Sequence, residues 1–528
     1  MAAALIAAAI LGAGRGAAQQ APRPNFVVIF SDDQAPGMTK ALPAVGRELA
    51  ARGTTFSSAI ASYPLCCPAR ATFLTGQYAH NHGTKGNNRR GGGGYQALID
   101  PKRNLAAWLQ ANGYDTGFAG KWLNGLRTPH RAPPGWTSWS GLVGEGGDGL
   151  SSYYDFDVFE PDGIPRHFGA GASDYQTDAL TREYALPFID AHAAAPQPFF
   201  LWLAYHPPHF GLGRNDPAGE RCSTGAPTKR DGSQSAIPPP RYAKRFLGAR
   251  LPRPPSFDER DVSDKPKSVR HRAPLTREDI ERIERDYRCG LAALLALDDA
   301  VAEIVEHLRA TGQLGHTVIV FSADQGVMAG EHRIARGKNK PYEEALRVPL
   351  LIRGPGIPSG REVEAPVANA DLAPTILDLA GATVPEELTR PVDGVSLRTA
   401  LGGGAHDSNR AIPIEGRENT ARARHGFKVR SYVGVRTARF AYVEYRRARF
   451  EAVAAANSAP LGAGRTTDRE LYDLRSDPYE LRNLAREPSL ARVRRALARL
   501  TAEAARCTGA GCALEFAPGA QARRPRAR

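Results

Sequence analysis

The stretch NFVVIFSDDQ, residues 25–34, decides the fold of this chain. It begins with an unbroken apolar run rich in β-branched side chains and ends with a serine, two aspartates and a glutamine. Residues 317–326, TVIVFSADQG, repeat the pattern far downstream. Apolar runs of this length predict strands that are buried on both faces, as in parallel sheets. Because ligands of open α/β sheets gather at the carboxyl ends of such strands, we expect both polar ends at one edge of one sheet.

The two polar ends supply Asp32, Asp33, Asp324 and Gln325. Carboxylate and amide oxygens form a hard oxygen cage, which suits Ca²⁺ or Mg²⁺ better than Zn²⁺. Singly, Asp33 or Asp324 is better explained as the N-cap of a following helix. The adjacent aspartates after the first strand, echoed after the second, favour a metal site, with Ca²⁺ as first choice and Mg²⁺ as the alternative.

Helix and strand patterns alternate through most of the chain. Helices are expected at residues 105–112 and 276–310, and strands at residues 114–119, 199–205 and 348–352. This alternation predicts a doubly wound α/β domain, in which helices cover both faces of a mostly parallel sheet. Residues 210–274 form an insertion rich in Pro, Arg and Gly, which predicts a functional lid or a disordered loop.

The composition changes at residues 402–404, which are all glycine. Beyond them, residues 432–435 and 440–445 alternate as an antiparallel hairpin does, and residues 490–505 predict a helix, so a smaller α+β domain follows. We therefore expect a signal peptide at residues 1–18, a large α/β domain at residues 19–402, an α+β domain at residues 403–514 and a basic disordered tail at residues 515–528.

The composition is that of an ordinary globular protein, because 42% of the 528 residues are hydrophobic and 23% are charged. A net charge of +14 favours anionic partners. No motif typical of nucleic-acid binding accompanies it, so we expect an anionic substrate and no nucleic acid. The apolar stretch at residues 2–11 is too short to span a bilayer, which predicts a cleaved signal, no stable membrane insertion and a secreted, periplasmic or extracellular protein.

Six cysteines are few for a secreted chain of this size. Cys507 and Cys512 are the best candidates for a disulfide, although pairing cannot be deduced from sequence. Cys222 and Cys289 stay unassigned. The other two cysteines lie in the most distinctive motif of the chain, LCCPARATFLTG at residues 65–76.

This motif places Cys66 at the start of a short helix. Pro68 suits the first helical turn, and Arg70 lies one turn beyond Cys66 on the same side. A helix N-terminus favours anions, and a guanidinium beside it adds a fork of donors. Cys66 therefore occupies a place where an oxyanion is stabilised. The alternatives are a buried structural thiol, or a disulfide with Cys67, which adjacent positions would strain.

With Leu, Thr and Gly completing it, the motif resembles the signature of the formylglycine-dependent sulfatases of the alkaline phosphatase superfamily. Residues 470–484 contain ELYDL, DP, Glu480 and NL, and resemble the C-terminal signature of that family. The resemblance covers nearly the whole length after the signal. It implies a large catalytic domain with a mostly parallel mixed sheet between helices, and a small C-terminal α+β domain with an antiparallel sheet.

The resemblance implies a role for each matching residue. Cys66 matches the cysteine that a formylglycine-generating enzyme oxidises to formylglycine, which joins the four oxygen ligands at the metal, and Arg70 matches its supporting arginine. Lys121 and Lys338 match two lysines that bind sulfate, and His209 matches the histidine that ends the middle strand. Gln325 departs from the Asn or His of many relatives but keeps an amide oxygen.

The implied mechanism is covalent. The hydrated aldehyde at position 66 attacks sulfur in line, while the metal, Lys121 and Lys338 neutralise the sulfate oxygens. His209 or Lys338 protonates the leaving oxygen. Loss of a proton from the second hydroxyl then expels sulfate and restores the aldehyde, so one hard displacement becomes two easier steps.

One position departs from the arylsulfatase pattern Gly-Lys-Trp-His, because Leu123 replaces the histidine and Asn124 follows it. This variant, the run Cys66-Cys67-Pro68 and the run His80-Asn81-His82 resemble the N-acetylglucosamine-6-sulfatases and the extracellular heparan 6-O-endosulfatases. The departure leaves the base for sulfate elimination open. Either histidine of the second run is a candidate, and solvated turn residues are an equal alternative.

The sequence therefore predicts a sulfuric ester hydrolase that acts on a sulfated sugar, such as glucosamine 6-sulfate. The first alternative is an arylsulfatase, or a phosphonate or phosphate ester hydrolase of the same superfamily. The second is a non-catalytic binder of sulfated glycans, if Cys66 stays unmodified.

Overall fold

The computed structural model describes residues 23–88, 93–126, 132–142, 153–211, 235–389, 391–423 and 426–517. The expected signal peptide at residues 1–18, Cys222 and the tail beyond residue 517 lie outside these residues.

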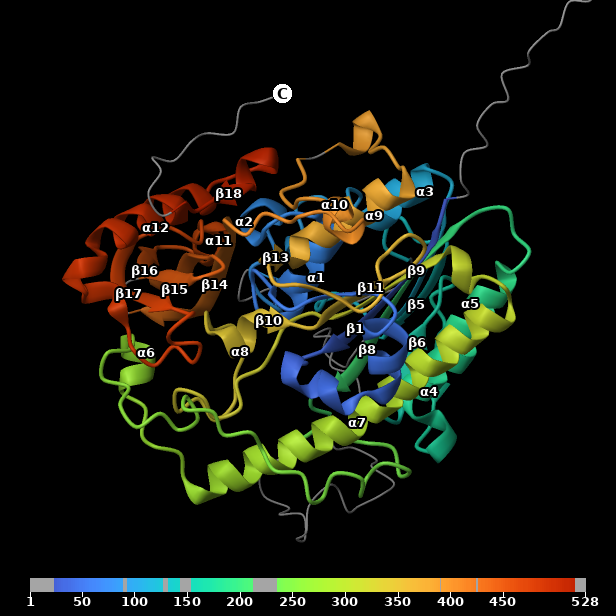
Figure 1. Cartoon of the computed structure of the whole chain (residues 1–528), viewed down its shortest axis with the longest axis horizontal. Helices are drawn as coiled ribbons and strands as arrows, with labels where there is room; N and C mark the ends of the chain where they lie inside the picture. The colour runs from blue at the N-terminus through green and yellow to red at the C-terminus, as the bar shows by residue number, and fades with distance from the viewer. Residues whose placement is uncertain are drawn as a thin grey trace, which may run out of the picture.

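The described residues form one large and two smaller sheets with surrounding helices (Figure 1). The strands are β1 (Asn25–Asp32), β2 (Thr54–Phe56), β3 (Ala59–Ile60), β4 (Asp115–Lys121), β5 (Ser138–Leu142), β6 (Phe156–Phe159), β7 (Pro165–Phe168), β8 (Phe199–Pro208), β9 (Thr317–Ala323), β10 (Arg347–Val348), β11 (Leu350–Arg353), β12 (Arg361–Val363), β13 (Val367–Ala368), β14 (Arg410–Ala423), β15 (Gly426–Arg436), β16 (Phe440–Phe450), β17 (Arg465–Asp473) and β18 (Leu514–Glu515). The helices are α1 (Cys66–Thr75), α2 (Ala79–His82), α3 (Leu105–Ala111), α4 (Gln176–Leu180), α5 (Leu186–Ala191), α6 (Lys267–Arg270), α7 (Arg277–Ala310), α8 (Glu343–Leu346), α9 (Leu372–Ala380), α10 (Arg398–Leu401), α11 (Val453–Ser458) and α12 (Ala491–Ala504).

The large sheet has ten strands in the order β12-β2-β11-β9-β1-β8-β4-β5-β6-β7. Its central strands β9, β1, β8, β4 and β5 run parallel to one another. The flanking strands β11, β6 and β7 each run antiparallel to their inner neighbour. The expected mostly parallel mixed sheet is confirmed.

The register of the central strands explains where polar side chains meet. Phe26 of β1 pairs with Phe200 of β8 on one side and with Val318 of β9 on the other. At the carboxyl end, Ser31 pairs with Ala323. The residues that follow β1 and β9 therefore emerge side by side at one edge of the sheet.

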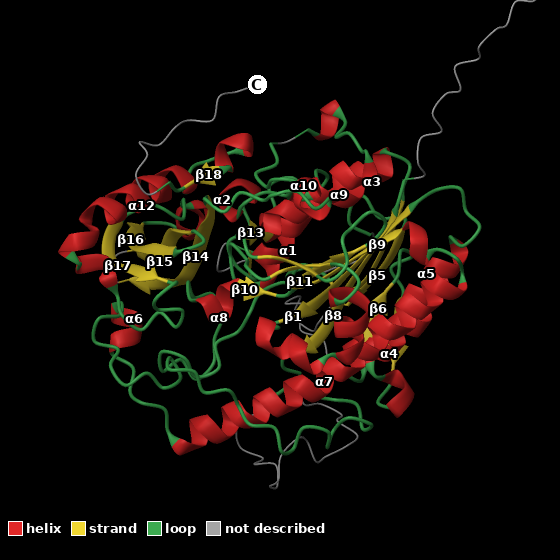
Figure 2. Ribbon diagram, viewed as in Figure 1, coloured by secondary structure: helices red, strands yellow, loops and turns green. Residues whose placement is uncertain are grey.

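Helices cover both faces of this sheet, as Figure 2 shows for α7, α4 and α5 below it and for α1, α3 and α9 above it. Alternate residues of β1 separate between the two layers. Val28 belongs to the core with Trp108 of α3, whereas Ile29 belongs to the core with Leu297 of α7. The side chains of both layers are buried, which confirms the expectation of strands buried on both faces. The capping box of Thr276 and Asp279 begins α7.

A five-stranded sheet in the order β17-β16-β15-β14-β18 forms the C-terminal part of the chain. Its strands pair antiparallel, and α12 contacts β15 and β16. In Figure 1 this sheet lies beside the large one, with α8 between the two. The expected hairpin is present, and its strands are longer than the sequence pattern indicated. The expected antiparallel α+β fold is confirmed.

One expected strand is two strands. The apolar stretch at residues 348–352 divides at Pro349 into β10, which pairs with β3, and β11, which pairs with β9 and β2. Proline has no N–H to donate to a ladder, so it ends one strand before the next begins. The two pieces consequently belong to different sheets.

The structure shows the state of three of the four cysteines outside the motif. Cys507 and Cys512 form a disulfide, as expected. Cys289 is a buried cysteine of α7. Within the described ranges, no helix is both long and apolar enough to cross a membrane.

Candidate active site

The carboxyl edge of the large sheet brings the predicted site residues together. The end of β1 supplies Asp32 and Asp33, the end of β4 supplies Lys121, and the turn after β8 supplies His209. Asp33 has a left-handed φ of 65°, a conformation that is uncommon outside glycine and clusters at functional sites. The residues that share direct contacts here are Asp32, Asp33, Cys66, Arg70, Lys121, His209, Asp324, Gln325 and Lys338.

Cys66 is the first residue of α1 and is buried. Its sulfur lies 2.9 Å from Lys338 Nζ, 3.4 Å from Gln325 Nε2, 3.6 Å from Asp32 Oδ1 and 4.0 Å from Lys121 Nζ. Burial raises the pKa of the Cys66 thiol, and the Asp32 carboxylate raises it further. The sulfur is therefore a neutral thiol at neutral pH, which is a poor nucleophile.

Three carboxylates surround a position suited to a cation. One oxygen each of Asp32, Asp33 and Asp324 lie within 4.8 Å of one another. Gln325 donates through Nε2 to Asp33, and its buried Oε1 has no hydrogen-bond partner in the described ranges. The amide nitrogen is the atom that faces Asp33 and Cys66, so Oε1 becomes a cation ligand when the amide turns by 180°. A cation there would also satisfy the carboxylates. The donor set fits a hard cation such as Ca²⁺ or Mg²⁺.

Arg70 is the internal counterion of this group. Its Nε donates to Asp324 Oδ2 at 2.9 Å and its terminal nitrogen to Asp32 Oδ2 at 3.2 Å. The other terminal nitrogen donates to the carbonyl oxygen of Lys121 at 2.5 Å. Arg70 is fully buried, so it acts on Cys66 by fixing the carboxylates around it.

The lysines contact the same carboxylates. Lys121 Nζ pairs with Asp32, and Lys338 Nζ lies 2.8 and 2.9 Å from the two oxygens of Asp33. Burial opposes ionisation of Asp32, yet the charges of Lys121 and Arg70 hold the pKa of this carboxyl well below its usual range. Burial and the neighbouring Asp32 charge raise the pKa of Asp324 to about 7. Asp33 similarly raises the pKa of Lys338, which therefore stays protonated.

Two histidines, His206 and His209, lie close together at the end of β8. His209 Nδ1 donates to the Phe210 carbonyl at 2.9 Å, so Nε2 faces Asp33 Oδ2 at 3.6 Å. Burial and Lys121 lower the pKa of His209 well below its usual value, so the ring is neutral. His206, which the sequence analysis missed, donates to the same carbonyl, and its buried Nδ1 has no partner among the described residues. The sequence signal for it was its place in the run His206-Pro207-Pro208-His209, directly after the apolar residues of β8.

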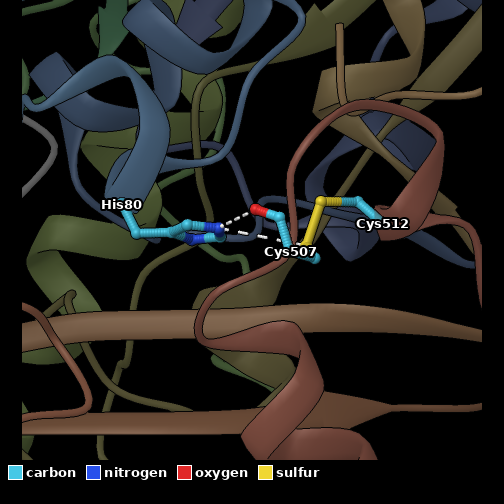
Figure 3. A group of neighbouring side chains, drawn as sticks. All are labelled: His80, Cys507 and Cys512. Atoms are coloured by element: carbon cyan, nitrogen blue, oxygen red, sulfur yellow. Dashed lines mark hydrogen bonds between the residues drawn. A yellow bond between two sulfur atoms is a disulfide. The ribbon is translucent and has the colours of Figure 1, made fainter. Parts of the chain in front are cut away.

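The two candidates for the elimination base have hydrogen-bond partners outside the group described above. His80 Nδ1 binds Glu415 Oε2 at 2.9 Å, and Nε2 donates to the carbonyl of Cys507 at 2.9 Å. Figure 3 shows the ring directed at this carbonyl beside the disulfide. His82 binds Thr72 Oγ1 and the Thr84 N–H, each at 3.1 Å. Both nitrogens of each ring have partners in the scaffold, which does not favour either histidine as the base.

The fold also explains Leu123, which stands where the arylsulfatase pattern has histidine. It is buried in the same apolar core as Trp122 and Phe118. The position where other patterns carry histidine therefore packs here as a core residue, and Asn124 accepts a hydrogen bond from Tyr95 N–H through its carbonyl at 2.7 Å.

A cavity of about 660 Å³ borders Asp33 and His209. Most of its other walls are apolar, and they include Met38, Phe210 and Ile283. Lys40, Asp286 and Arg336 add charge at its margin. Space for the organic part of a ligand therefore lies next to the carboxylates.

Family models match most of the chain. The model described as Sulfatase matches residues 24–382, and the model described as N-sulphoglucosamine sulphohydrolase, C-terminal, matches residues 330–454. The chain is 32% identical to human N-acetylglucosamine-6-sulfatase over 74% of its own length and 66% of that protein. It is 32% identical to the arylsulfatase of Volvox carteri over 96% of its own length and 78% of that protein.

The fold is that of known structures as well. The structure of BT4656 in complex with its substrate D-glucosamine-2-N,6-O-disulfate aligns with a TM-score of 0.69 and 23% identity, over 91% of this chain and 97% of that one. The chain nevertheless spans only part of several relatives, 66% of the human protein and 48% of a putative extracellular sulfatase Sulf-1 homologue of Caenorhabditis elegans.

Proposed function

This chain belongs to the sulfatase family, and on that premise we propose that it hydrolyses sulfate monoesters through a formylglycine formed from Cys66 and one divalent cation. The observation that carries the proposal is the position of Cys66 at the start of α1, with Lys338 Nζ 2.9 Å from its sulfur and Asp32 Oδ1 3.6 Å away. A sulfate monoester is anionic, so its nucleophile must lie where cationic groups neutralise the sulfate oxygens.

The unmodified thiol is unsuited to this chemistry, because burial raises the pKa of Cys66 and keeps it uncharged. Oxidation by a formylglycine-generating enzyme would supply a hydrated aldehyde, whose hydroxyl is the nucleophile. Of the adjacent cysteines, Cys66 is the one that has proline at the second and arginine at the fourth following position, and the one whose sulfur contacts Lys338. Cys67 contacts the Asn124 carbonyl instead, at 3.8 Å.

The cation we propose is Ca²⁺, with Mg²⁺ as the alternative. Its ligands would be Asp32, Asp33, Asp324, Gln325 and the modified residue 66. The three clustered carboxylates support this assignment, and a 180° turn of the Gln325 amide would place its unpartnered Oε1 beside Asp33. When bound, the cation supplies positive charge to the sulfate oxygens and to the attacking hydroxyl.

Side chains of the protein then bind the sulfate and protonate the leaving group. Lys121 and Lys338 bind the sulfate oxygens, because both carry ammonium groups within 4.0 Å of the Cys66 sulfur. Lys338 holds a proton that it can give to the leaving oxygen. His209 is neutral in the free site, and an arriving anion raises its pKa, so it can take up a proton and donate it in turn.

For the substrate we propose a sulfated sugar, most simply one with glucosamine 6-sulfate. Support comes from the similarity to N-acetylglucosamine-6-sulfatases and from the net charge of +14, which attracts polyanionic glycans. We also propose that the chain is exported through a signal at residues 1–18, that residues 19–402 form the catalytic domain and residues 403–514 the C-terminal one, and that it needs no nucleic acid or membrane.

The test compares the full chain produced with and without a formylglycine-generating enzyme. Its substrates are glucosamine 6-sulfate, other sugar sulfates, heparan fragments, nitrophenyl sulfate and a phosphonate ester. We expect turnover of sulfated sugars only after maturation, and none by Cys66→Ala with an unchanged melting temperature. Full activity with an unmodified cysteine would refute the mechanism.

The second candidate is an arylsulfatase. The apolar walls of the cavity beside His209 favour an aromatic leaving group, and the Volvox arylsulfatase aligns over nearly the whole chain. Turnover of nitrophenyl sulfate with none of any sulfated sugar would select this candidate and keep the sulfatase mechanism.

A further inference from the structure

A second group of ligand-type side chains lies outside the active site, where the loop after β9 meets the turn after β17. It consists of His332 on that loop, Glu344 in α8 and Glu480 in the turn, and we call it the His332 site. One ligand atom of each residue lies within 4.8 Å of the other two. His332 is 0% exposed and Glu480 is 2% exposed.

The His332 ring is oriented by a carboxylate behind it. Its Nδ1 donates to Glu259 Oε2 at 2.6 Å, and Lys265 Nζ holds the other oxygen of Glu259 at 3.1 Å. Nε2 is therefore left with its lone pair, and it is buried without a hydrogen-bond partner in the described part of the chain. Metal-binding histidines almost always donate their other ring N–H, to a carboxylate as here, to a backbone carbonyl or to a water.

Both carboxylates are also fixed while keeping an oxygen for a ligand. Ser256 Oγ donates to Glu344 Oε1 at 3.2 Å, and the Glu343 N–H donates to Glu480 Oε2 at 2.9 Å. Glu344 Oε2 is buried without a partner among the described residues. When both carboxyls are ionised, the unsatisfied atoms of the group carry only lone pairs, so a cation or a proton must lie between them.

The neighbouring lysine and arginine side chains do not neutralise the carboxylates of the His332 site. Lys265 pairs with Glu259, and Arg436 pairs with Glu343 at 2.9 Å. Across the described residues, Glu331, Glu344 and Glu480 form no ion pair with a lysine or arginine.

We propose that His332, Glu344 and Glu480 bind a Zn²⁺ ion that joins the loop carrying Lys338 to the C-terminal part of the chain. One imidazole nitrogen with two carboxylate oxygens is a donor set for zinc, whereas Ca²⁺ prefers oxygen ligands alone. Ligand atoms about 2.1 Å from a tetrahedral ion lie roughly 3.4 Å apart, which exceeds a hydrogen bond and falls within the spacing of this group. Glu344 also borders the cavity that reaches Asp33 and His209, so an ion can enter and keep a water ligand there.

The test is metal analysis of the full chain. The protein is stripped with a chelator, incubated with ZnCl₂ and CaCl₂, desalted and analysed for both elements. We expect one zinc ion per chain in the native protein, and none in His332→Gln or in Glu480→Gln. Glu470→Gln is the matched control, because Glu470 is equally buried but accepts hydrogen bonds from Tyr342, Tyr445 and Tyr472 and lies outside the group.

A spectroscopic measurement protects the test against variants that fail to fold. Titration of the stripped native protein with Co²⁺ should give visible d–d absorption that one equivalent of Zn²⁺ abolishes, and Zn²⁺ should raise its melting temperature. Native protein that retains no zinc, or His332→Gln that retains as much as native, overturns the inference. The outcome is independent of catalysis, because Cys66→Ala should keep its zinc while losing turnover.

Discussion

Replacing His80 by glutamine should weaken the fold at pH 6, leave it unchanged at pH 10 and spare turnover at pH 7. The ring connects α2, the helix after the Cys66 helix, to the disulfide loop through Glu415 and the Cys507 carbonyl. Burial opposes the charged ring, but Glu415 and this carbonyl prevail and raise the pKa of His80 to about 9. Glutamine keeps hydrogen-bonding capacity and removes the titrating charge.

The magnitude follows from this shift. Because the folded pKa exceeds the unfolded value of about 6.5, protonation stabilises the fold fully below pH 6.5 and ceases to do so as pH rises through 9. The linkage relation gives about 3 kcal/mol at pH 6, about 1.5 kcal/mol at pH 8 and almost nothing at pH 10. For a chain of this size, 3 kcal/mol corresponds to a melting temperature lower by about 3 °C.

The assay measures melting temperatures of native protein and of the variant from pH 6 to pH 10, with turnover of the matured enzyme at pH 7. His316→Gln is the control, because His316 is exposed. The difference between native and His80→Gln should shrink steadily with rising pH and vanish by pH 10. A difference that is constant across this range, or loss of turnover at unchanged stability, would refute the reasoning.

Three further predictions concern the active site. Peptide mass spectrometry of matured protein should find formylglycine at Cys66 and an intact thiol at Cys67; conversion of Cys67 instead would contradict the geometry. Chelation should abolish turnover until Ca²⁺ is restored, and Asp324→Ala should abolish it permanently with loss of bound calcium. If Asp324→Ala kept both calcium and activity, the ligand set would be wrong. His209→Ala should depress hydrolysis of sugar sulfates far more than that of nitrophenyl sulfate, whose good leaving group needs little protonation. Equal losses on both substrates would restrict His209 to binding.

The parts of the fold that sequence predicted are those governed by local pattern. The apolar runs ending at Asp32 and at Ala323 are buried on both faces, and parallel pairing then brings their polar ends together without further information. Strand patterns also placed Lys121 and His209 near strand ends, whereas their roles came from the family resemblance. Pro349 shows the limit, because it divides an apolar run between two sheets whose partners are far away in sequence.

The parts that sequence could not predict depend on distant partners. Glu415 and Cys507 lie 335 and 427 positions from His80 in the sequence. Both form hydrogen bonds with its ring, and no local pattern indicates these partners. The His332 site joins one residue of the loop before α8, one residue of α8 and one of the turn after β17, so no local spacing in the sequence indicates it. The burial of His206 could not be predicted either. It depends on the place of β8 between β1 and β4, which brings the charge of Lys121 close to the ring.

Arg70 explains why this site can carry so many buried charges. Three carboxylates face two lysines and one arginine, and the arginine uses Nε and both terminal nitrogens within the scaffold. Its geometry is fixed by the planar guanidinium, which lysine cannot reproduce. Lys121 and Lys338, by contrast, reach the carboxylates by single ammonium groups that also approach the Cys66 sulfur. Arg70 is therefore the permanent counterion of the carboxylates. Under the proposed function, the two lysines can leave the carboxylates and pair with the oxygens of an incoming sulfate.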